Sequence, residues 1–525
     1  MEDQIDVLIT CSGLGSRLGE ITNYTNKSLV RIGTKPALSW IIDSYPKNSR
    51  FVVTVGHYSD HVRQYLQIAH SDKNVEIVDV DKFEGKGSSL AYSMLCAKKY
   101  LRKDFVFHAC DTIAEKHENV RSNCLWISKD PNTSGNYRTV IYDGLDLKFI
   151  QEKGDASSSE AYIGKCYIKD HKEFWRSLEN IYEDRGADDS SLSDCHAINL
   201  MLSNGSSFHI KKVKEWTDIG NLESLTQARH KNDENINVLD KPEESIFFVG
   251  GSVIKFFHDP HIVESRVKRT QHLSDTTPRI DQYTKNFYAY KKVEGEILSR
   301  HAKFSCKTIE SLLQWADQKL WSVASNEDYS DRCNEFYVEK TKSRIKKYFY
   351  DRRLQDKESV INGETVPCMS TLIDRSKDDL VENYKASLFH GDFILENILM
   401  NDTGEFILLD WRQDFSGDLK FGDAYYDICK LNHNLVVNHD IVNRGLYSCL
   451  LDESGNISVD IMCSKKFLDA KETLMKFCCK AGYNRRKVEI LTAIIWINMS
   501  PLHDRRFGDF LFNFGKYNLY RALQT

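Results

Sequence analysis

The first hundred residues alternate between short apolar segments and segments with helical periodicity, and this alternation limits the possible folds more than any other feature. Strands are predicted at 5–10, 51–55, 75–80 and 104–110, and helices at 59–69 and 90–100. Strands and helices that alternate with short connections predict a parallel sheet with helices on both faces. In such a doubly wound, Rossmann-like α/β domain, ligands bind where the strands end.

Glycines and polar residues follow the ends of these strands. They are Gly13, Gly15, Ser16 and Arg17 after the first strand, Gly87 and Ser88 before the second helix, and Asp111 after the fourth strand. Glycines after a strand let backbone N–H groups approach phosphates closely. The loops match neither a G-x-G-x-x-G nor a Walker A pattern, and a helix N-cap is the alternative role for Asp111.

Five motifs in residues 5–225 resemble those of the sugar-phosphate nucleotidyltransferases. They are a G-x-G-[ST]-R-L loop at 13–18, Lys27 before Ser28-Leu29, a Lys-Pro turn at 35–36, Glu152-Lys153, and W-x-D-I-G-[NT] at 216–221. Three positions depart from the family pattern, where Ser16 replaces Thr, and where Asn26 and Gly154 each replace Pro. The loss of Pro at Asn26 removes a rigid turn but leaves Lys27.

The resemblance implies a role for each matching residue. Gly13, Gly15, Ser16, Gly87 and Ser88 would bind the nucleotide, Arg17 and Lys27 the leaving pyrophosphate, Lys153 the acceptor phosphate, and Asp111 and Asp218 Mg²⁺. The acceptor's phosphate would attack the α-phosphorus of a nucleoside triphosphate, with no protein nucleophile. CTP is the favoured triphosphate, with UTP and dTTP as alternatives.

The pattern changes after this region. Strands are expected at 125–128, 139–142, 147–152 and 208–213, and helices at 169–182 and 191–203. We expect a nucleotidyltransferase domain at 1–229, a linker at 230–244 and a second domain at 245–525. The linker is charged, polar and free of aromatic residues.

The second domain is predicted to contain a small lobe at 245–295 and a large helical lobe at 296–525. The small lobe has strands at 245–249, 252–257 and 286–293 and a helix at 262–273. The large lobe has helices at 308–323, 335–351, 442–451, 465–479, 488–499 and 507–523.

The stretch 388–431 contains three polar residues at fixed offsets inside an apolar hairpin. Asp392 follows His390-Gly391, Asn397 follows five residues later, and Asp410 ends the next strand. Burying such groups without a role is costly. Phosphoryl transfer from ATP needs a carboxylate to accept the hydroxyl proton, and an amide oxygen and a second carboxylate to hold magnesium.

This spacing resembles the aminoglycoside phosphotransferase and choline kinase family, which has a bilobal, protein-kinase-like α+β fold. The resemblance implies Asp392 as catalytic base and Asn397 and Asp410 as Mg²⁺ ligands. It also implies that Lys255 contacts the ATP phosphates with Glu264 as its ion-pair partner, that the strand carrying Lys291 and Val293 leads to the adenine-binding hinge, and that Asp427 is structural.

The two halves together predict a bifunctional enzyme. The C-terminal half would phosphorylate a small alcohol or sugar hydroxyl with ATP, and the N-terminal half would couple that phosphate to a nucleoside monophosphate. The product would be an NDP-activated precursor for surface polysaccharide or lipid decoration. The alternatives are that one half is only a binding or regulatory module, or that the C-terminal half modifies an antibiotic.

The acceptor is left open among choline, a sugar, glycerol or another polyol. Choline would require an aromatic and acidic cage, for which Trp411, Tyr425, Tyr426 and Trp496 are available. The net charge of −5 gives no basic field for nucleic acid. The chain has no apolar run long enough to cross a bilayer, and its 14 scattered cysteines lack a C-x-x-C pair. We therefore expect a cytoplasmic enzyme of small molecules, with homo-oligomer formation open.

Overall fold

The computed structural model describes residues 4–129, 137–155, 159–185, 188–232 and 241–525. The chain forms two compact units. Unit 1 comprises residues 1–260 and 281–292, and unit 2 comprises residues 261–280 and 293–525. The predicted linker at 230–244 lies in part, at 233–240, outside the described residues.

Among the described residues of unit 1, a mixed sheet of nine strands forms the centre. Its strands lie in the order β5-β4-β1-β6-β11-β8-β12-β10-β9. Its strands are β1 (Asp6–Cys11), β4 (Arg50–Val55), β5 (Asn74–Asp79), β6 (Phe105–Ala109), β8 (Cys124–Lys129), β9 (Val140–Asp143), β10 (Asp146–Ile150), β11 (Glu160–Ile168) and β12 (His209–Lys212). The first four in chain order run parallel, as the alternation predicted. The antiparallel β11 follows β6 in the sheet, so the doubly wound expectation is confirmed for this sheet with a mixed extension.

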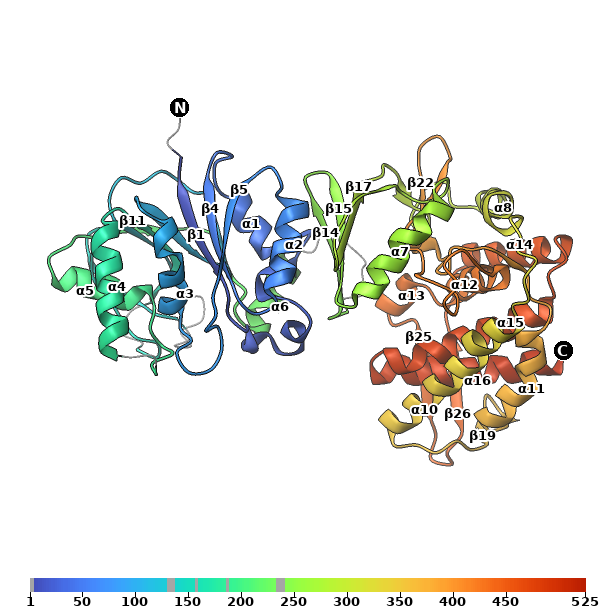
Figure 1. Cartoon of the computed structure of the whole chain (residues 1–525). Helices are drawn as coiled ribbons and strands as arrows, with labels where there is room; N and C mark the ends of the chain where they lie inside the picture. The colour runs from blue at the N-terminus through green and yellow to red at the C-terminus, as the bar shows by residue number, and fades with distance from the viewer. Residues whose placement is uncertain (1–3, 130–136, 156–158, 186–187, 233–240) are drawn as a thin grey trace. The chain divides into compact units, whose positions relative to one another are not determined.

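Helices cover both faces of this sheet (Figure 1). They are α1 (Ala37–Asp43), α2 (Ser59–Ala69), α3 (Leu90–Ala97), α4 (His171–Arg185) and α5 (Asp194–Ser203). Helix α6 (Leu222–Lys231) instead packs on Leu18, Val30 and Ile32, outside the sheet. Alternate residues of β1 enter separate cores. Leu8 packs with α3, α4 and α5, whereas Val7 and Ile9 pack with α1 and α2. The strands are apolar on both faces for this reason.

A second, four-stranded sheet in the order β14-β15-β17-β16 packs on α2. Its strands are β14 (Glu244–Val249), β15 (Ser252–Phe257), β16 (Ile280–Tyr283) and β17 (Phe287–Lys291). Phe256 and Phe287 contact His61 of α2, and the backbone N–H of Asn286 donates to Gln64 Oε1 at 2.7 Å. The sequence assigned these strands to the small lobe of the second domain, and the structure groups them with unit 1.

Unit 2 is mainly helical. Its helices are α7 (Pro260–Leu273), α8 (Cys306–Ala316), α9 (Ser330–Cys333), α10 (Lys340–Arg352), α11 (Met369–Val381), α12 (Ala424–Val436), α13 (His439–Asn443), α14 (Lys465–Lys480), α15 (Arg485–Met499) and α16 (Arg505–Gln524). Two π-helical turns, Asp317–Trp321 and Asn334–Glu339, continue α8 and precede α10. Such turns occur frequently at functional sites.

Short sheets join these helices. Their strands are β18 (Glu296–Ile297), β19 (Ser359–Ile361), β20 (Glu364–Val366), β21 (Ala386–Leu388), β22 (Ile398–Met400), β23 (Phe406–Leu408), β24 (Phe421–Asp423), β25 (Tyr447–Leu451) and β26 (Ile457–Ile461). The predicted hairpin around 401–404 is present, because β22 and β23 pair antiparallel across it. No helix in the described part of the chain is long and apolar enough to span a membrane.

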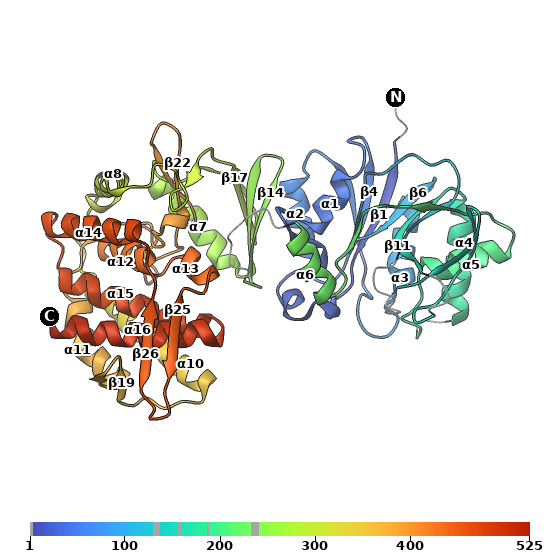
Figure 2. The same ribbon diagram turned by 180° about the vertical axis from the view of Figure 1, so that it is seen from behind.

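The helix predicted at 442–451 is wrong. The short α13 ends at Asn443, and residues 447–451 form β25, which pairs with β26 beside α16 (Figure 2). Gly445 adopts a φ of 62° between the two elements, and the Asp452 side chain accepts from the backbone N–H groups of Ser454 and Asn456. These turn contacts favour a hairpin over a continuous helix.

Candidate functional site

Two short strands bring the predicted metal ligands of unit 1 together. Strand β7 (Thr112–Ala114) begins directly after Asp111, and β13 (Trp216–Asp218) ends in Asp218. The strands pair antiparallel with Asp218 opposite Thr112. The backbone N–H of Ile219 donates to the Asp111 carbonyl at 3.0 Å. Asp111 and Asp218 therefore lie close together, although they are about a hundred positions apart in sequence.

Gly220 marks the centre of this site. A Cβ atom at Gly220 would lie 3.1 Å from Asp218 Oδ1, 3.2 Å from Arg17 Nη2 and 3.3 Å from Asp111 Oδ2. Both carboxylates and the guanidinium therefore surround one buried position that only glycine leaves open. The sequence motif contained Gly220, but its role as the contact point of the other three residues was not predicted.

Lys27 forms an ion pair with Asp111, at 3.0 Å between Nζ and Oδ2. Burial lowers the pKa of Lys27, but Asp111 raises it more, so the ammonium stays charged. Burial raises the pKa of Asp111, but Lys27 and Arg17 hold it below its usual value. Burial and the charge of Asp111 raise the pKa of Asp218. The two carboxylates thus repel each other, and a cation between them would relieve that repulsion.

Asp218 is also held by neutral donors. The Tyr137 hydroxyl donates to its Oδ2 at 2.9 Å, the Ser224 hydroxyl donates to the same oxygen at 3.1 Å, and the Gly220 N–H donates to Oδ1 at 3.1 Å. These contacts fix the carboxylate before any ligand binds.

Asn26 replaces the rigid turn that proline would provide. Its buried side chain donates to the backbone carbonyls of Cys11 at 2.7 Å and His57 at 2.6 Å, and accepts from the Ser28 N–H at 2.9 Å. Gly15 adopts a φ of 68°, and a Cβ there would lie 2.9 Å from Lys27 Cβ. The glycine loop and the lysine segment are therefore packed directly on each other.

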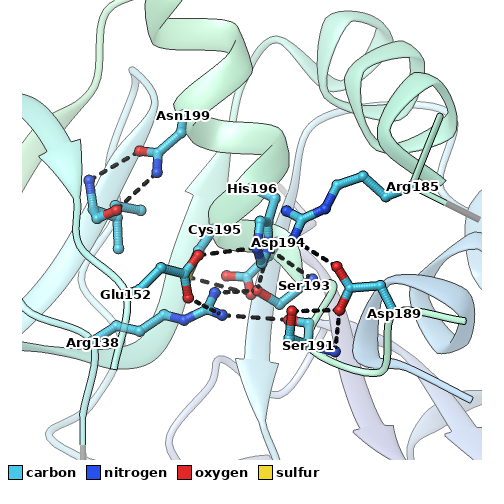
Figure 3. A network of polar contacts seen from close by, with 11 residues as sticks. Arg138, Glu152, Arg185, Asp189, Ser191, Ser193, Asp194, Cys195, His196 and Asn199 are labelled. Atoms are coloured by element: carbon cyan, nitrogen blue, oxygen red, sulfur yellow. Dashed lines mark hydrogen bonds and ion pairs between the residues drawn. The ribbon is translucent and has the colours of Figure 1, made fainter. Parts of the chain in front are cut away.

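Lys153 is exposed at the end of β10, and a polar network holds its neighbour Glu152 (Figure 3). Glu152 pairs with Arg138 at 2.9 Å and lies 3.1 Å from His196 Nε2. Arg138 also donates to the Ser193 hydroxyl at 2.6 Å. Desolvation, Arg17 and Arg138 lower the pKa of Lys153, while Asp111 and Asp218 raise it. The net effect is a pKa of Lys153 below its usual value.

The remaining predicted nucleotide contacts of unit 1 lie in two loops. Gly13 precedes the 3₁₀ helix Ser16–Asn23, and Ser16 begins it. Gly87 and Ser88 precede α3, which Ser89 caps by accepting from the Tyr92 N–H at 3.1 Å. The Ser88 hydroxyl donates to the Gly85 carbonyl at 2.7 Å, so the loop forms a closed turn.

The donor set of unit 1 fits Mg²⁺. No three His, Cys, Asp or Glu side chains in the described ranges converge closely enough to hold a metal ion by themselves. Mg²⁺ usually binds through one or two carboxylates together with substrate phosphates. Asp111 and Asp218 supply two such carboxylates beside the cations Arg17 and Lys27.

In unit 2 the three residues of the predicted phosphotransferase site converge. The Asn397 amide nitrogen donates to Asp392 Oδ2 at 2.8 Å and to the Asp392 carbonyl at 3.0 Å. The Leu409 N–H donates to the Asn397 carbonyl at 2.7 Å, which places Asp410 next to them. Asp410 adopts a φ of 59°, rare for a residue other than glycine. The amide oxygen of Asn397 and the carboxylate of Asp410 are hard oxygen donors that fit Mg²⁺.

Asp427 supports the loop that carries Asp392, as the sequence predicted. Its two oxygens accept from the backbone N–H groups of His390 and Gly391, each at 2.7 Å, and from Trp321 Nε1 at 3.1 Å. Burial raises the pKa of Asp427 to about 6. The buried Arg269 donates to the Phe389 carbonyl at 2.5 Å on the same loop.

Two ion pairs at this site were not predicted. Lys430 on α12 binds Asp392 at 2.8 Å, and Arg266 on α7 binds Asp410. Burial raises the pKa of Asp392, but Lys430 brings it below its usual value, so the carboxylate is ionised. Arg266 is far from the motif in sequence, and Lys430 lies beyond its spaced residues, so no local pattern indicated either ion pair.

The predicted ATP contacts outside this loop lie on the small sheet and α7. Lys255 is buried in the middle of β15, opposite Tyr288 of β17, while Ile254 and Phe256 face α2. Lys291 is exposed at the end of β17, and Val293 follows the strand. Glu264 pairs with Lys268 at 2.6 Å on the exposed face of α7. The roles of Lys255, Lys291 and Val293 stay predictions.

The aromatic residues considered for a choline cage occupy different environments. The buried Trp411 donates to the Arg266 carbonyl at 3.0 Å, Tyr425 packs on Tyr483, Tyr426 on Phe336, and Trp496 on Phe514. Their described contacts do not form one cage.

Comparison with known proteins gives matches for part of the chain. No family model matches the sequence. The protein named bifunctional protein GlmU from Methanococcus maripaludis strain C7 is 24% identical over 260 residues, which is 48% of this chain and 60% of that protein. Its namesake from Methanocaldococcus jannaschii is 23% identical over 257 residues, with the same coverage. The chain thus spans about three fifths of the length of the curated relatives that it matches.

Part of the chain is also similar to solved structures. The CTP:phosphocholine cytidylyltransferase from Streptococcus pneumoniae covers 44% of this chain and 99% of its own, with 15% identity and a TM-score of 0.38. The inositol-1-phosphate CTP transferase from T. maritima covers 45% and 98%, with 17% identity and a TM-score of 0.36. The sequence matches support the prediction that the N-terminal half is similar to the sugar-phosphate nucleotidyltransferases.

Proposed function

We propose that unit 1 transfers a nucleoside monophosphate from a nucleoside triphosphate, with CTP favoured, to a phosphorylated small molecule. This proposal rests on the convergence of three side chains around Gly220, those of Asp111, Asp218 and Arg17. Arg17 and Lys27 would neutralise the leaving pyrophosphate, and Lys153 would bind the acceptor's phosphate. Mg²⁺, when bound to the two carboxylates, would offset the charge of the phosphates.

We infer that unit 2 phosphorylates a hydroxyl group with ATP. The hydrogen bond between Asn397 and Asp392, next to Asp410, supports this function. Asp392 would accept the hydroxyl proton while Lys430 keeps it ionised and oriented. A base of low pKa suffices because the transition state of phosphoryl transfer is loose. Asn397 and Asp410 would hold Mg²⁺, which would offset the negative charge of the ATP phosphates.

The two activities would act in sequence on one small molecule. Unit 2 would make the phosphorylated acceptor, and unit 1 would convert it into an NDP-activated precursor for surface polysaccharide or lipid decoration. The alternative with one catalytic half and one binding module differs from this proposal in turnover, because a binding module would bind a nucleotide without consuming it.

Nucleotide binding to the full chain tests the two sites separately. Calorimetry with Mg²⁺ should detect a CTP site and an ATP site in the wild-type protein. Asp111→Asn should weaken CTP and leave ATP unchanged, whereas Asp410→Asn should do the reverse. Equal effects of both substitutions on both nucleotides would contradict two independent sites.

A further inference from the structure

Three basic side chains lie beside the Asp392 site and form no ion pair with a carboxylate among the residues that the structure describes. They are Lys340 and Arg344 on α10 and Arg412, two residues after Asp410, and we call them the cationic cluster. Lys340 Nζ and Arg412 Cζ lie 4.2 and 4.7 Å from the centre of the same ring, that of Phe336. Phe336, Lys340 and Arg344 follow one another at intervals of four residues, so they share one helix face.

The cluster is continuous with the proposed catalytic base. The ring of Phe336 contacts that of Tyr426 at 4.9 Å, and Tyr426 precedes Lys430 by one turn of α12. Lys430 pairs with Asp392 at 2.8 Å. A Cβ at Gly391 would lie 2.5 Å from Arg412 Cβ, so Arg412 packs on the residue just before Asp392.

Asp414 offsets the charges of the cluster only in part. Within the described ranges, no Asp or Glu forms an ion pair with Lys340, Arg344 or Arg412, all of which are half-buried. Burial and the charges of Arg412, Arg344 and Lys430 lower the pKa of Lys340 to about 6, so near pH 7 this amine is mostly neutral until a bound anion restores its proton. Burial and Arg412 also lower the pKa of Arg344. A group of half-buried like charges is unfavourable unless an anion offsets it.

We propose that the hydroxyl acceptor of unit 2 also carries an anionic group, a carboxylate or a phosphate, which the cationic cluster binds. This inference depends on the proposed phosphotransferase function of unit 2. The cluster would hold the anionic end of the acceptor while its hydroxyl meets Asp392. Choline and aminoglycosides are cations, which the same charges would repel.

Matched three-carbon probes test the proposal on the full-length protein. Glycerol, glycerate and glycerol 3-phosphate share hydroxyl groups and differ in having no anion, a carboxylate or a phosphate, and choline serves as the cationic probe. Calorimetry without ATP should show at least one anionic probe binding about tenfold or more tightly than glycerol and choline, because contacts between charged groups are strong. The anionic probe that binds more tightly shows whether the cluster prefers a carboxylate or a phosphate.

Two variants test whether the anionic probe binds at the cationic cluster. The double variant Lys340→Met, Arg344→Met should lose the preference for the anionic probe, and should raise KM for that acceptor more than it lowers kcat. Lys342→Met removes an exposed charge on the same helix, one that pairs with Glu339, and should keep the preference. Unchanged preference in the double variant, equal binding of all probes, or no binding of either anionic probe would overturn the proposal.

Two further outcomes separate this inference from the proposed function. If the preference is present and depends on the cluster, but no probe is phosphorylated, the anion site stands and the phosphotransferase function fails for these acceptors. If the double substitution weakens ATP instead and leaves the acceptors unaffected, the cluster belongs to the nucleotide site and the inference is wrong.

Discussion

Gly220→Ala would place a methyl group at the centre of the unit 1 site. Gly220 has a backbone conformation that alanine adopts readily, so the substitution should leave the fold intact. The new methyl carbon would lie 3.1–3.3 Å from Asp218, Arg17 and Asp111, closer than ordinary van der Waals contact. At least one of these groups must therefore move by a few tenths of an ångström.

The expected loss of CTP affinity follows from the contacts that Asp218, Arg17 and Asp111 would make with the bound nucleotide and Mg²⁺. Losing one contact of a charged group costs roughly 1.5–3 kcal/mol, which is about tenfold to a hundredfold in affinity. Calorimetry should show weaker Mg²⁺-dependent CTP binding by that factor, and pyrophosphate release should fall with it. ATP binding by unit 2 in the same preparation is the internal control. Wild-type CTP affinity in a folded Gly220→Ala protein would refute the placement of the site around Gly220.

Three other substitutions test the supporting structure. Asn26→Ala leaves the buried Cys11 carbonyl and the partly buried His57 carbonyl without their donor, so calorimetry should show that the free energy of unfolding falls by about 2–4 kcal/mol. Burial lowers the pKa of His70 from 6.5 to about 4, so between these values the unfolded chain binds the extra proton. His70 should therefore lower the free energy of unfolding by about 1.4 kcal/mol per pH unit as the pH drops from 6.5 toward 4. Buried histidines such as His61 and His117 add to the total slope, and denaturant titrations of His70→Gln should lack only the contribution of His70. Asp427→Ala removes the acceptor for the His390 and Gly391 N–H groups, so ATP turnover should collapse while CTP binding is unchanged; equal loss of both would argue for general unfolding.

Local sequence patterns predicted the parts of the fold that local physics determines. The helix at 59–69 and the strand at 252–257 have the predicted bounds, because amphipathic and apolar periods are clear there. The region 442–451 was misread because a short apolar run is compatible with either a helix or a strand. The turns in this region depend on Gly445 and Asp452, and the hydrophobic periodicity of the sequence does not reflect these two residues.

The candidate sites also contain residues that local motifs indicate and residues that only tertiary packing brings in. Motifs at strand ends and hairpins indicated Asp111, Asp218, Asp392 and Asn397, which the structure brings together in pairs, while their roles stay predictions. Lys430, Arg266 and the cationic cluster were missed. Arg266, Lys340 and Arg344 reach the site from helices distant in sequence, whereas Lys430 and Arg412 follow Asp410 but belong to no motif. Only tertiary packing brings such charges together, and no spacing along the chain records it.

The most direct test of the two-step function is product analysis with the pure protein, Mg²⁺, ATP, CTP and a panel of alcohols, sugars and their acids. Mass spectrometry should detect an NDP-linked product with the wild-type protein. Asp392→Ala should form it only when the phosphorylated acceptor is supplied, and Asp111→Ala should stop at that phosphorylated acceptor. Consumption of ATP without coupling of any nucleotide, whichever triphosphate is offered, would contradict the proposed function of unit 1.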